Sequence, residues 1–535
     1  MEITFIGAAR EVTGSCTLLR VGNRNILVDY GLRQGAEVFK ETPLPVAPSD
    51  IDCILLTHAH IDHSGKIPKL FSDGFRGRIF ATDATVKLCQ IMLRDSAHIQ
   101  ETEAEWHNRK AKRSGTNAFP PLYTMDDAVR SLSLFTPCQY EKNYSLFDGV
   151  TVKFSDAGHL LGSASILVTA TEDQTTKKIL FSGDVGNVSR PLIRDPSFPT
   201  EGDYIVIEST YGDRLHPPRK SYEAQLCEVL QSTFDRGGNV IIPSFAVGRT
   251  QEMLYLLREI KRKNLVKNHD FPVWVDSPLA AEATGIYSGG MREFYDEETL
   301  ADLDKGIDPL RFPGLCLSKT TEESRFLNID KTPKVIISAS GMCDAGRIRH
   351  HLKHNLWRAE CTVLFVGYQA EGTLGRTLTD GAKSVTLFNE TVKVNAHIEV
   401  MDGISGHADS KILLDWLSSI KIPPEKVFVN HGQESSATNF AETIKEKLRF
   451  PAVAPYPNST YDLVTGECLD FGVTEKANPA DSAENHSGFS SAFQRLRQAA
   501  ERLLGIALSK KGHSNRDLDR FAKQIDDLSS RWKNR

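Results

Sequence analysis

Several common signals are missing from this chain of 535 residues. None of its apolar runs reaches the ~20 residues that a helix needs to cross a bilayer. The first residues, Met1 to Gly7, have neither the basic region nor the long apolar region of a signal peptide. The nine cysteines are scattered and form no C-x-x-C pair, which is typical of reduced thiols rather than of a disulfide framework. We therefore expect a cytoplasmic protein without membrane contact.

Basic charge is not in excess either. The formal net charge of −5 argues against a generally basic nucleic-acid binder, although a local basic cleft binds nucleic acid whatever the total. Apolar residues make up 40% and charged residues 25% of the chain, as in ordinary globular proteins. A chain of this length is expected to form two or three domains. It contains no P-loop and no convincing internal repeat, so other motifs must indicate the function.

The clearest motif is His58-Ala59-His60-Ile61-Asp62-His63, which follows the apolar run Cys53–Leu56. A short apolar run that ends in such a polar cluster is typical of a buried strand followed by a loop. Four strong ligands on one loop suit two neighbouring metal ions, with His58 and His60 facing one and Asp62 and His63 the other. Imidazole with carboxylate, and no cysteine, favours zinc or another borderline divalent metal. A solvated polar loop is the weaker alternative.

Further polar residues stand beside predicted strand ends. Asp29 follows Ile26–Val28, and Asp184 follows another apolar run. His159 lies between glycines that allow close backbone approach, and His431 directly follows a predicted strand. Each signal is weak alone; Asp29, for example, is equally consistent with an ordinary turn.

The pattern of apolar residues changes near residue 204, where predicted apolar strands begin to alternate with predicted amphipathic helices. This pattern predicts a parallel α/β unit at 209–385. It interrupts a β-rich first fold, which we assign to 1–208 and 386–473. A polar, turn-rich linker is predicted at 474–490. Apolar residues at helical spacing predict a helical hairpin within 491–535, which either caps the molecule or contacts a partner.

Two loops of the inserted unit are candidate substrate contacts. Ser244 and Arg249 lie between a predicted strand and a predicted helix, and Ser340-Gly341 has the same strand-then-small-residue character. Helix N-termini offer free backbone N–H groups to anions such as phosphate. Simple tight turns are the alternative.

The histidine motif, with single His, Asp and His residues farther on, resembles the metallo-β-lactamase superfamily. The motifs Glu208-Ser209-Thr210-Tyr211-Gly212, Ser405-Gly406-His407-Ala408-Asp409 and Val429-Asn430-His431-Gly432 are similar to its nucleic-acid-processing branch, β-CASP. This branch includes the cleavage endonuclease of eukaryotic mRNA 3′-end formation and its prokaryotic homologues. The resemblance covers about residues 1–470. It implies an α/β protein: an αββα sandwich with an inserted parallel α/β β-CASP domain, here followed by the helical tail.

The resemblance also implies roles for individual residues. One Zn²⁺ would be bound by His58, His60 and His159, a second by Asp62, His63 and His431, with Asp184 bridging the two. Asp29 would orient ligands from outside the metal shell. Two zinc ions can share a hydroxide that attacks a phosphodiester, with Asp62 counted among the catalytic residues. His407, paired with Glu208, would be the general acid.

The implied substrate is single-stranded RNA, with products that carry 5′-phosphate and 3′-hydroxyl ends. Family members that act on RNA tend to have histidine at the position of His431, and this argues against a DNA nuclease. The long insertion and the Glu208–His407 pair argue against a small-molecule hydrolase, and the intact ligands against a non-catalytic RNA-processing scaffold. Endonuclease action is favoured, with 5′–3′ exonuclease action left open. Relatives often dimerise, so a homodimer is also an expectation.

Overall fold

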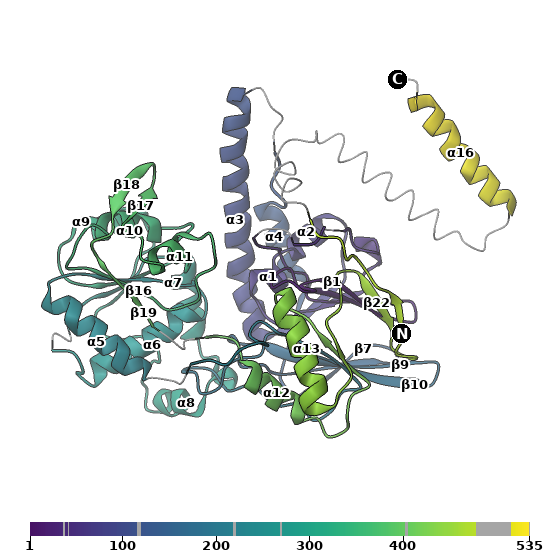
Figure 1. The fold of residues 1–535 in the computed structure, drawn as a ribbon, viewed down its shortest axis with the longest axis horizontal. Helices are drawn as coiled ribbons and strands as arrows, with labels where there is room; N and C mark the ends of the chain where they lie inside the picture. The colour runs from purple at the N-terminus through teal and green to yellow at the C-terminus, as the bar shows by residue number, and fades with distance from the viewer. Residues whose placement is uncertain are drawn as a thin grey trace. The chain divides into compact units, whose positions relative to one another are not determined.

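The structure is a computed structural model, and it describes residues 1–35, 38–40, 42–114, 119–217, 221–267, 270–401, 405–477 and 515–533 (Figure 1). Contacts divide the chain into two units. One comprises residues 1–102 and 121–476, and the other residues 103–120 and 477–535. Among the described helices, none has the length and apolarity required to cross a membrane.

Two mixed sheets form the first fold. The larger has eight strands in the order β23-β22-β1-β2-β3-β4-β5-β6. Its strands are β1 (Glu2–Gly7), β2 (Cys16–Val21), β3 (Arg24–Val28), β4 (Cys53–Leu55), β5 (Arg78–Thr82), β6 (Phe135–Cys138), β22 (Ser459–Asp462) and β23 (Cys468–Asp470). The second has seven strands in the order β21-β20-β11-β10-β9-β8-β7. Its strands are β7 (Asn143–Phe147), β8 (Val150–Asp156), β9 (Ala164–Glu172), β10 (Thr175–Phe181), β11 (Tyr204–Ile207), β20 (Lys426–Val429) and β21 (Ala452–Val453).

These sheets pack face to face, because alternate residues along each strand point to one side. Their shared core includes Ile3, Phe5, Ile26, Val28, Val152, Phe154, Ile166 and Val168. The outer face of the larger sheet packs on α2 (Ile67–Ser72) and on α3 (Asp83–Ser114) through its residue Leu88. The outer face of the smaller sheet packs on α12 (Ser410–Ser418) and α13 (Glu434–Leu448). The predicted αββα sandwich is therefore confirmed.

The inserted unit leaves the sandwich after β11 and returns before β20, and these two strands are parallel neighbours. It contains a parallel sheet of six strands, β14-β13-β15-β12-β16-β19. These strands are β12 (Val240–Pro243), β13 (Val273–Val275), β14 (Leu315–Leu317), β15 (Val335–Ser338), β16 (Thr362–Phe365) and β19 (His397–Val400). Strand β19 comes after residue 385, where the sequence analysis ends the inserted domain. A small hairpin of β17 (Ser384–Leu387) and β18 (Glu390–Lys393) precedes it.

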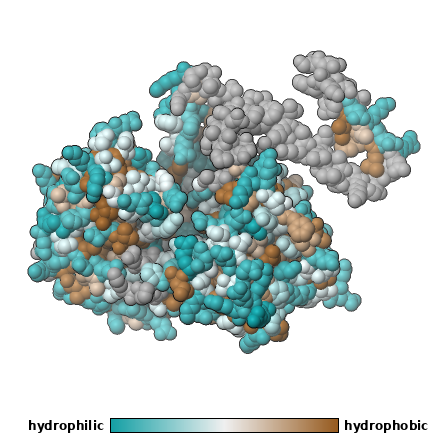
Figure 2. Space-filling model, in the orientation of Figure 1, coloured by the Kyte–Doolittle hydropathy of each residue, from teal (hydrophilic) through white to brown (hydrophobic). Residues whose placement is uncertain are grey.

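Helices accompany this sheet as the alternating sequence pattern predicts. They are α5 (Tyr222–Asp235), α6 (Arg249–Arg262), α7 (Pro278–Tyr287), α8 (Glu297–Asp304), α9 (Thr321–Ile329), α10 (Ile348–Asn355) and α11 (Leu374–Thr379). The remaining described helices before residue 478 are α1 (Ile61–Ser64) and α4 (Met125–Ser131), with short 3₁₀ turns at Pro48–Asp50, Leu132–Leu134 and Arg292–Phe294. Some apolar side chains remain on the surface, and on the face in Figure 2 they form separate brown patches among hydrophilic residues.

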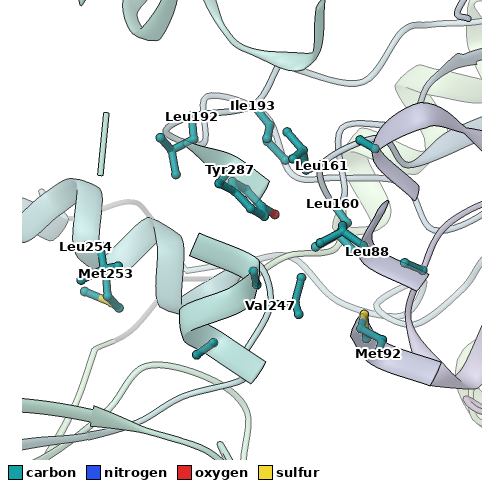
Figure 3. Close-up of a cluster of buried hydrophobic side chains, with 14 of the residues drawn as sticks. Leu88, Met92, Leu160, Leu161, Leu192, Ile193, Val247, Met253, Leu254 and Tyr287 are labelled. Atoms are coloured by element: carbon teal, nitrogen blue, oxygen red, sulfur yellow. The ribbon is translucent and has the colours of Figure 1, made fainter. Parts of the chain in front are cut away.

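An apolar cluster joins the sandwich to the inserted unit. Leu160, Leu161, Leu192 and Ile193 come from loops of the sandwich, whereas Val247 belongs to the loop before α6. Figure 3 shows these side chains gathered around Tyr287 of α7. All are buried. Burial of apolar surface is the dominant favourable term in such packing, so the cluster fixes the inserted unit beside the loops that carry the motifs.

In the tail, α16 (Asn515–Lys533) confirms the second helix of the predicted hairpin. Phe521 and Ile525, two of its apolar positions, are half-buried. The predicted first helix lies outside the described residues, as does the linker from residue 478 onward.

Candidate metal centre

Neighbouring strand ends bring the predicted ligands together. Asp184, Glu208 and His431 follow β10, β11 and β20, which are adjacent parallel strands of one sheet. Asp29 and His58 follow β3 and β4, which are adjacent parallel strands of the other. Because the carboxyl ends of parallel neighbours meet at one edge, residues far apart in sequence become close in space.

The histidine motif is part loop and part helix. His58 and His60 precede α1, whereas Asp62 and His63 lie within its single turn, so the prediction of a loop over the whole motif was wrong at its second half. Gly31 packs against this turn. A Cβ on Gly31 would lie 1.6 Å from the carbonyl oxygen of Asp62, so only glycine allows this close approach.

One group of ligand atoms comprises three imidazole nitrogens and a carboxylate oxygen. His60 Nδ1 lies 3.0 Å from His58 Nε2 and 3.2 Å from His159 Nε2. Asp184 Oδ2 lies 3.5 Å from His58 Nε2 and 3.6 Å from His159 Nε2. Ligands about 2.0–2.1 Å from a tetrahedral zinc would be about 3.3–3.4 Å apart, and the observed spacing is close to this.

A second group lies on the other side of Asp184. His63 Nε2 is 3.1 Å from His431 Nε2 and 3.3 Å from Asp184 Oδ1. Asp62 Oδ2 is 3.7 Å from His431 Nε2. Glu208, Asp184 and His431 also form a third possible grouping of ligand atoms. The two oxygens of Asp184 thus face different histidine groups, as a bridging ligand requires.

The hydrogen bonds of the imidazoles leave lone pairs directed into these groups. His63 Nδ1 lies 2.7 Å from Asp29 Oδ2, and His159 Nδ1 lies 3.2 Å from the carbonyl oxygen of Gly406. Both oxygens accept, so each Nδ1 donates its proton, and in the neutral imidazole each Nε2 then has a lone pair. Asp184 Oδ1 is buried and has no hydrogen-bond donor among the described residues. Converging lone pairs around an unsatisfied carboxylate oxygen fit divalent metal ions.

Burial and neighbouring carboxylates together set the charge state of these side chains. Burial lowers the pKa of His58 and His159 well below the usual value, and that of His60 to about 4. It also opposes protonation of His63, but the carboxylates of Asp184 and Asp29 raise the pKa of this imidazole well above the usual value, so metal binding there displaces a proton. Burial also opposes ionisation of Asp184, but the imidazoles around it, His431 first, hold its pKa well below the usual value. Neutral imidazole and ionised carboxylate are the forms that bind metals.

The Asp29 carboxylate contacts residues of the histidine motif and the residue before it. Its carboxylate accepts hydrogen bonds from His63 Nδ1, from the backbone and hydroxyl of Thr57, and from the Ser15 hydroxyl. Thr57 in turn contacts His58 Nδ1 at 3.1 Å. Asp29 itself is buried, with φ of 60°. These contacts are more than those of a simple turn, and the orientation of metal ligands by Asp29 stays a prediction.

We expect Asp29→Asn to lower metal affinity or activity about 10–100-fold, as is usual for partners of metal ligands. The amide would turn an N–H₂ donor toward groups that already donate. Metal content after dialysis, measured by mass spectrometry, checks this. Asp52→Asn is the matched control, because Asp52 also accepts a backbone hydrogen bond (Asn25 N, 2.8 Å) but precedes β4. Equal metal retention in both variants would contradict the role of Asp29.

His407 and Glu208 form a pair beside the first group. His407 Nδ1 lies 3.2 Å from Glu208 Oε1 and 4.0 Å from Asp184 Oδ2. Glu208 is buried and also accepts from the backbone N–H of Val185 at 2.6 Å. Burial alone would lower the pKa of His407, but the Glu208 carboxylate raises it to about 9. The side chain of His407 is 23% exposed, so the imidazole whose protonated form Glu208 favours lies partly open to solvent at the edge of the ligand groups.

The two predicted substrate loops lie side by side at the carboxyl ends of β12 and β15. A Cβ on Gly341 would meet Phe245 at 3.2 Å. Ser244 is only 1% exposed, and its hydroxyl contacts Thr250 Oγ1 and the carbonyl of Phe245. Arg249 is paired with Glu252, and the Ser340 hydroxyl contacts the carbonyl of Ala345. These side chains are engaged within the protein, and their contact with substrate stays a prediction.

Sequence analysis did not predict the contacts that Thr57, Gly406 and Arg190 make with the candidate ligands and their loops. Thr57 directly precedes the motif, which was a usable signal. The Gly406 carbonyl contacts His159 and Arg190, and each of these residues is more than two hundred positions away in the sequence. No local pattern indicates such pairs.

Three segments of the chain match known protein families. Residues 9–75 match the metallo-β-lactamase superfamily, and residues 250–378 match the β-CASP domain. Residues 391–455 match the Zn-dependent metallo-hydrolase RNA specificity domain. The matched segments contain four predicted ligands of the first motif together with His407 and His431.

Similar proteins extend over most of the chain. Ribonuclease TTHA0252 from Thermus thermophilus is 37% identical over 438 residues, which are 81% of this chain and 94% of that protein. Transcription termination factor FttA from Methanocaldococcus jannaschii is 30% identical, over 85% of this chain and 70% of the relative. An RNase J-like protein from the same organism is 31% identical, over 85% of this chain and 97% of the relative.

Proposed function

Because the chain belongs to the β-CASP family of the metallo-β-lactamase superfamily, we propose that it is a ribonuclease that hydrolyses phosphodiester bonds of single-stranded RNA with two zinc ions. The observation that carries the proposal is the position of His407, paired with Glu208 and next to the bridging carboxylate of Asp184. Ligand groups alone would serve many hydrolases. A protonated imidazole beside them is what the leaving oxygen of a phosphodiester needs.

In this proposal, His58, His60 and His159 would hold one ion, Asp62, His63 and His431 would hold the other, and Asp184 lies between the two groups. Divalent ions bound there would supply a nucleophile at neutral pH and neutralise charge on the phosphate. The protein supplies the geometry. Asp29 fixes the tautomer of His63, and the Gly406 carbonyl fixes that of His159. The donor set of imidazole and carboxylate, spaced as for a tetrahedral site, supports zinc.

His407 donates a proton to the leaving oxygen through Nε2, because Glu208 engages its Nδ1. The carboxylate keeps the imidazole in one orientation and favours its protonated form. RNA as the substrate is supported by the names of the ribonuclease relatives and by the matched RNA specificity domain. The free cysteines favour the cytoplasm, and a homodimer stays a prediction.

A direct assay tests the activity. The purified protein is incubated with end-labelled single-stranded RNA, with and without a chelator, and then with zinc restored. We expect fragments that disappear with chelator and return with zinc. No cleavage by the zinc-loaded protein would overturn the proposal. Fragment lengths distinguish internal cleavage from trimming at the 5′ end, and single-stranded DNA of the same sequence tests the choice of nucleic acid.

We expect unpaired RNA to be cleaved faster than duplex RNA. Most ligand side chains are buried, and Asp62 and His407 are only about one-fifth exposed, at 22% and 23%. A strand must therefore enter a narrow opening. Opening even one base-pair step costs about 1.4 kcal/mol, which corresponds to about a tenfold lower rate. The measurement compares kcat/KM for one labelled strand, alone and annealed to its complement. Equal values would contradict the narrow opening.

A further inference from the structure

Arg190 lies between the metal centre and the inserted unit. Its Nη1 donates to the carbonyl oxygens of His159 at 2.6 Å and of Gly158 and Gly406 at 3.2 Å. Gly406 directly precedes His407 in the chain. One guanidinium thus contacts the loop of a predicted metal ligand and the loop of the predicted general acid.

The other side of the guanidinium contacts the inserted unit. Arg190 Nε lies 2.7 Å and Nη2 lies 2.5 Å from Glu252 Oε1, on the first turn of α6. Glu252 Oε2 also accepts from Arg249 at 2.5 Å. A planar guanidinium with five fixed donors can satisfy a carboxylate and several carbonyls together, which a lysine cannot.

This contact is buried within apolar surroundings. The side chains of Arg190 and Glu252 are 9% and 7% exposed. Leu192, two residues after Arg190, and Met253, directly after Glu252, belong to the apolar cluster in Figure 3. An ion pair shielded from water is strong only if its geometry is good and its other donors are satisfied, and here all the donors named above have partners.

The carbonyl of Gly406 links the two loops directly. It accepts from Arg190 Nη1, from the backbone N–H of Asn187 and from His159 Nδ1, each at 3.2 Å. Residues 184–190, which begin with the bridging aspartate, also pair with the His407 segment, since Ala408 N donates to Val185 O at 2.8 Å. Displacement of Arg190 would therefore release the carbonyl that orients His159 and would shift His407.

We propose that Arg190 is a positioning residue and that, with Glu252, it lets the inserted unit hold His159 and His407 in their working orientations. The contacts of its guanidinium described above are with backbone carbonyls and with Glu252. The inserted unit then does more than cover the site, because it supports a metal ligand and the proton donor through one buried ion pair. The kinetic part of this inference rests on the proposed ribonuclease activity, whereas the metal-binding part does not.

The test compares Arg190→Lys and Glu252→Gln with Arg258→Lys in the full-length protein. Arg258 is the matched control. It is a buried arginine on α6, the helix that also carries Glu252, and it pairs with Asp302 at 2.6 Å and donates to the Asp308 carbonyl. For Arg190→Lys we expect kcat or metal affinity about 10–100-fold below wild type, with KM for RNA near wild type. Glu252→Gln should show a smaller loss of the same kind. Arg258→Lys should lower only the melting temperature.

Three readouts separate the outcomes. They are zinc retained per chain after dialysis, kcat and KM for RNA, and hydrolysis of bis(p-nitrophenyl) phosphate, which is too small to reach the inserted unit. Parallel loss on both substrates, or loss of zinc, supports the inference. Wild-type zinc retention and wild-type kcat in a folded Arg190→Lys protein would overturn it, as would equal losses in Arg258→Lys. If wild type cleaves no RNA, the ribonuclease proposal fails, and zinc retention still decides the role of Arg190.

Discussion

Replacing His407 with alanine should lower the rate of RNA cleavage about 10²–10⁴-fold, the usual contribution of a general acid, while the protein keeps its metal. His407 contacts Glu208 and lies beside Asp184, but it belongs to none of the groups of possible ligand atoms. Loss of its imidazole therefore removes a proton donor and leaves the lone pairs of the metal ligands in place.

The loss should appear in kcat more than in KM, because proton donation stabilises the transition state rather than the bound substrate. Zinc per chain and melting temperature are measured alongside. A suitable control is His397→Ala, since His397 is an exposed histidine on β19 of the inserted unit. An RNA substrate with a sulfur in place of the leaving 3′-oxygen should restore much of the rate to His407→Ala, because a thiolate leaves without a proton. Wild-type activity of His407→Ala on ordinary RNA would remove the general-acid assignment.

Much of the metal centre could be predicted because its ligands obey local rules. Four of them stand within six residues of one motif, and the others follow strands whose apolar runs are easy to recognise. Parallel strands of one sheet end at the same edge, so Asp184, Glu208 and His431 meet once β10, β11 and β20 pair. That these residues serve one site was implied by the family resemblance, since local patterns indicate that a strand exists but not which strand is its neighbour.

Contacts between backbone and distant side chains could not be predicted in this way. The carbonyl of Gly406 is chemically the same as any other carbonyl, and only the fold brings it to His159. Arg190 follows no motif that indicates burial, and a lone arginine in a loop is more often exposed. The loop at Ser244 shows the opposite case. Its sequence suggested an accessible hydroxyl, but tertiary packing buries that hydroxyl and pairs it with its own loop.

The inserted unit shows the same difference between elements that local patterns predict and contacts that depend on tertiary packing. Its alternating pattern predicted strands and helices correctly, for example a helix from Arg249 to about residue 261, where α6 ends at Arg262. It could not show that Glu252 on this helix would reach back to Arg190. Periodicity shows which face of α6 is apolar, whereas the partner of a single polar residue on that face depends on how two domains pack.

Replacing Asp184 with asparagine should have the largest effect, with loss of bound metal and of RNA cleavage together. The two carboxylate oxygens face different ligand groups, at 3.3 Å from His63 and 3.5 Å from His58. An amide keeps the shape but removes the negative charge and directs an N–H₂ donor at imidazole nitrogens or at a metal. Two-metal stabilisation of the transition state is worth several kcal/mol, so we expect activity to fall by about 10³-fold or more.

A thermal measurement distinguishes this result from simple unfolding. Metal that binds only the folded state stabilises it by about 4 kcal/mol when present at about 1,000 times its Kd. Chelator should therefore lower the melting temperature of wild type but leave that of Asp184→Asn nearly unchanged. Asp296→Asn is the control, because Asp296 caps α8 through Thr299 N at 2.7 Å, and asparagine caps a helix equally well. A variant Asp184→Asn that kept two metals per chain and full activity would contradict the bridging role, and the arrangement of both ligand groups around one carboxylate would need another explanation.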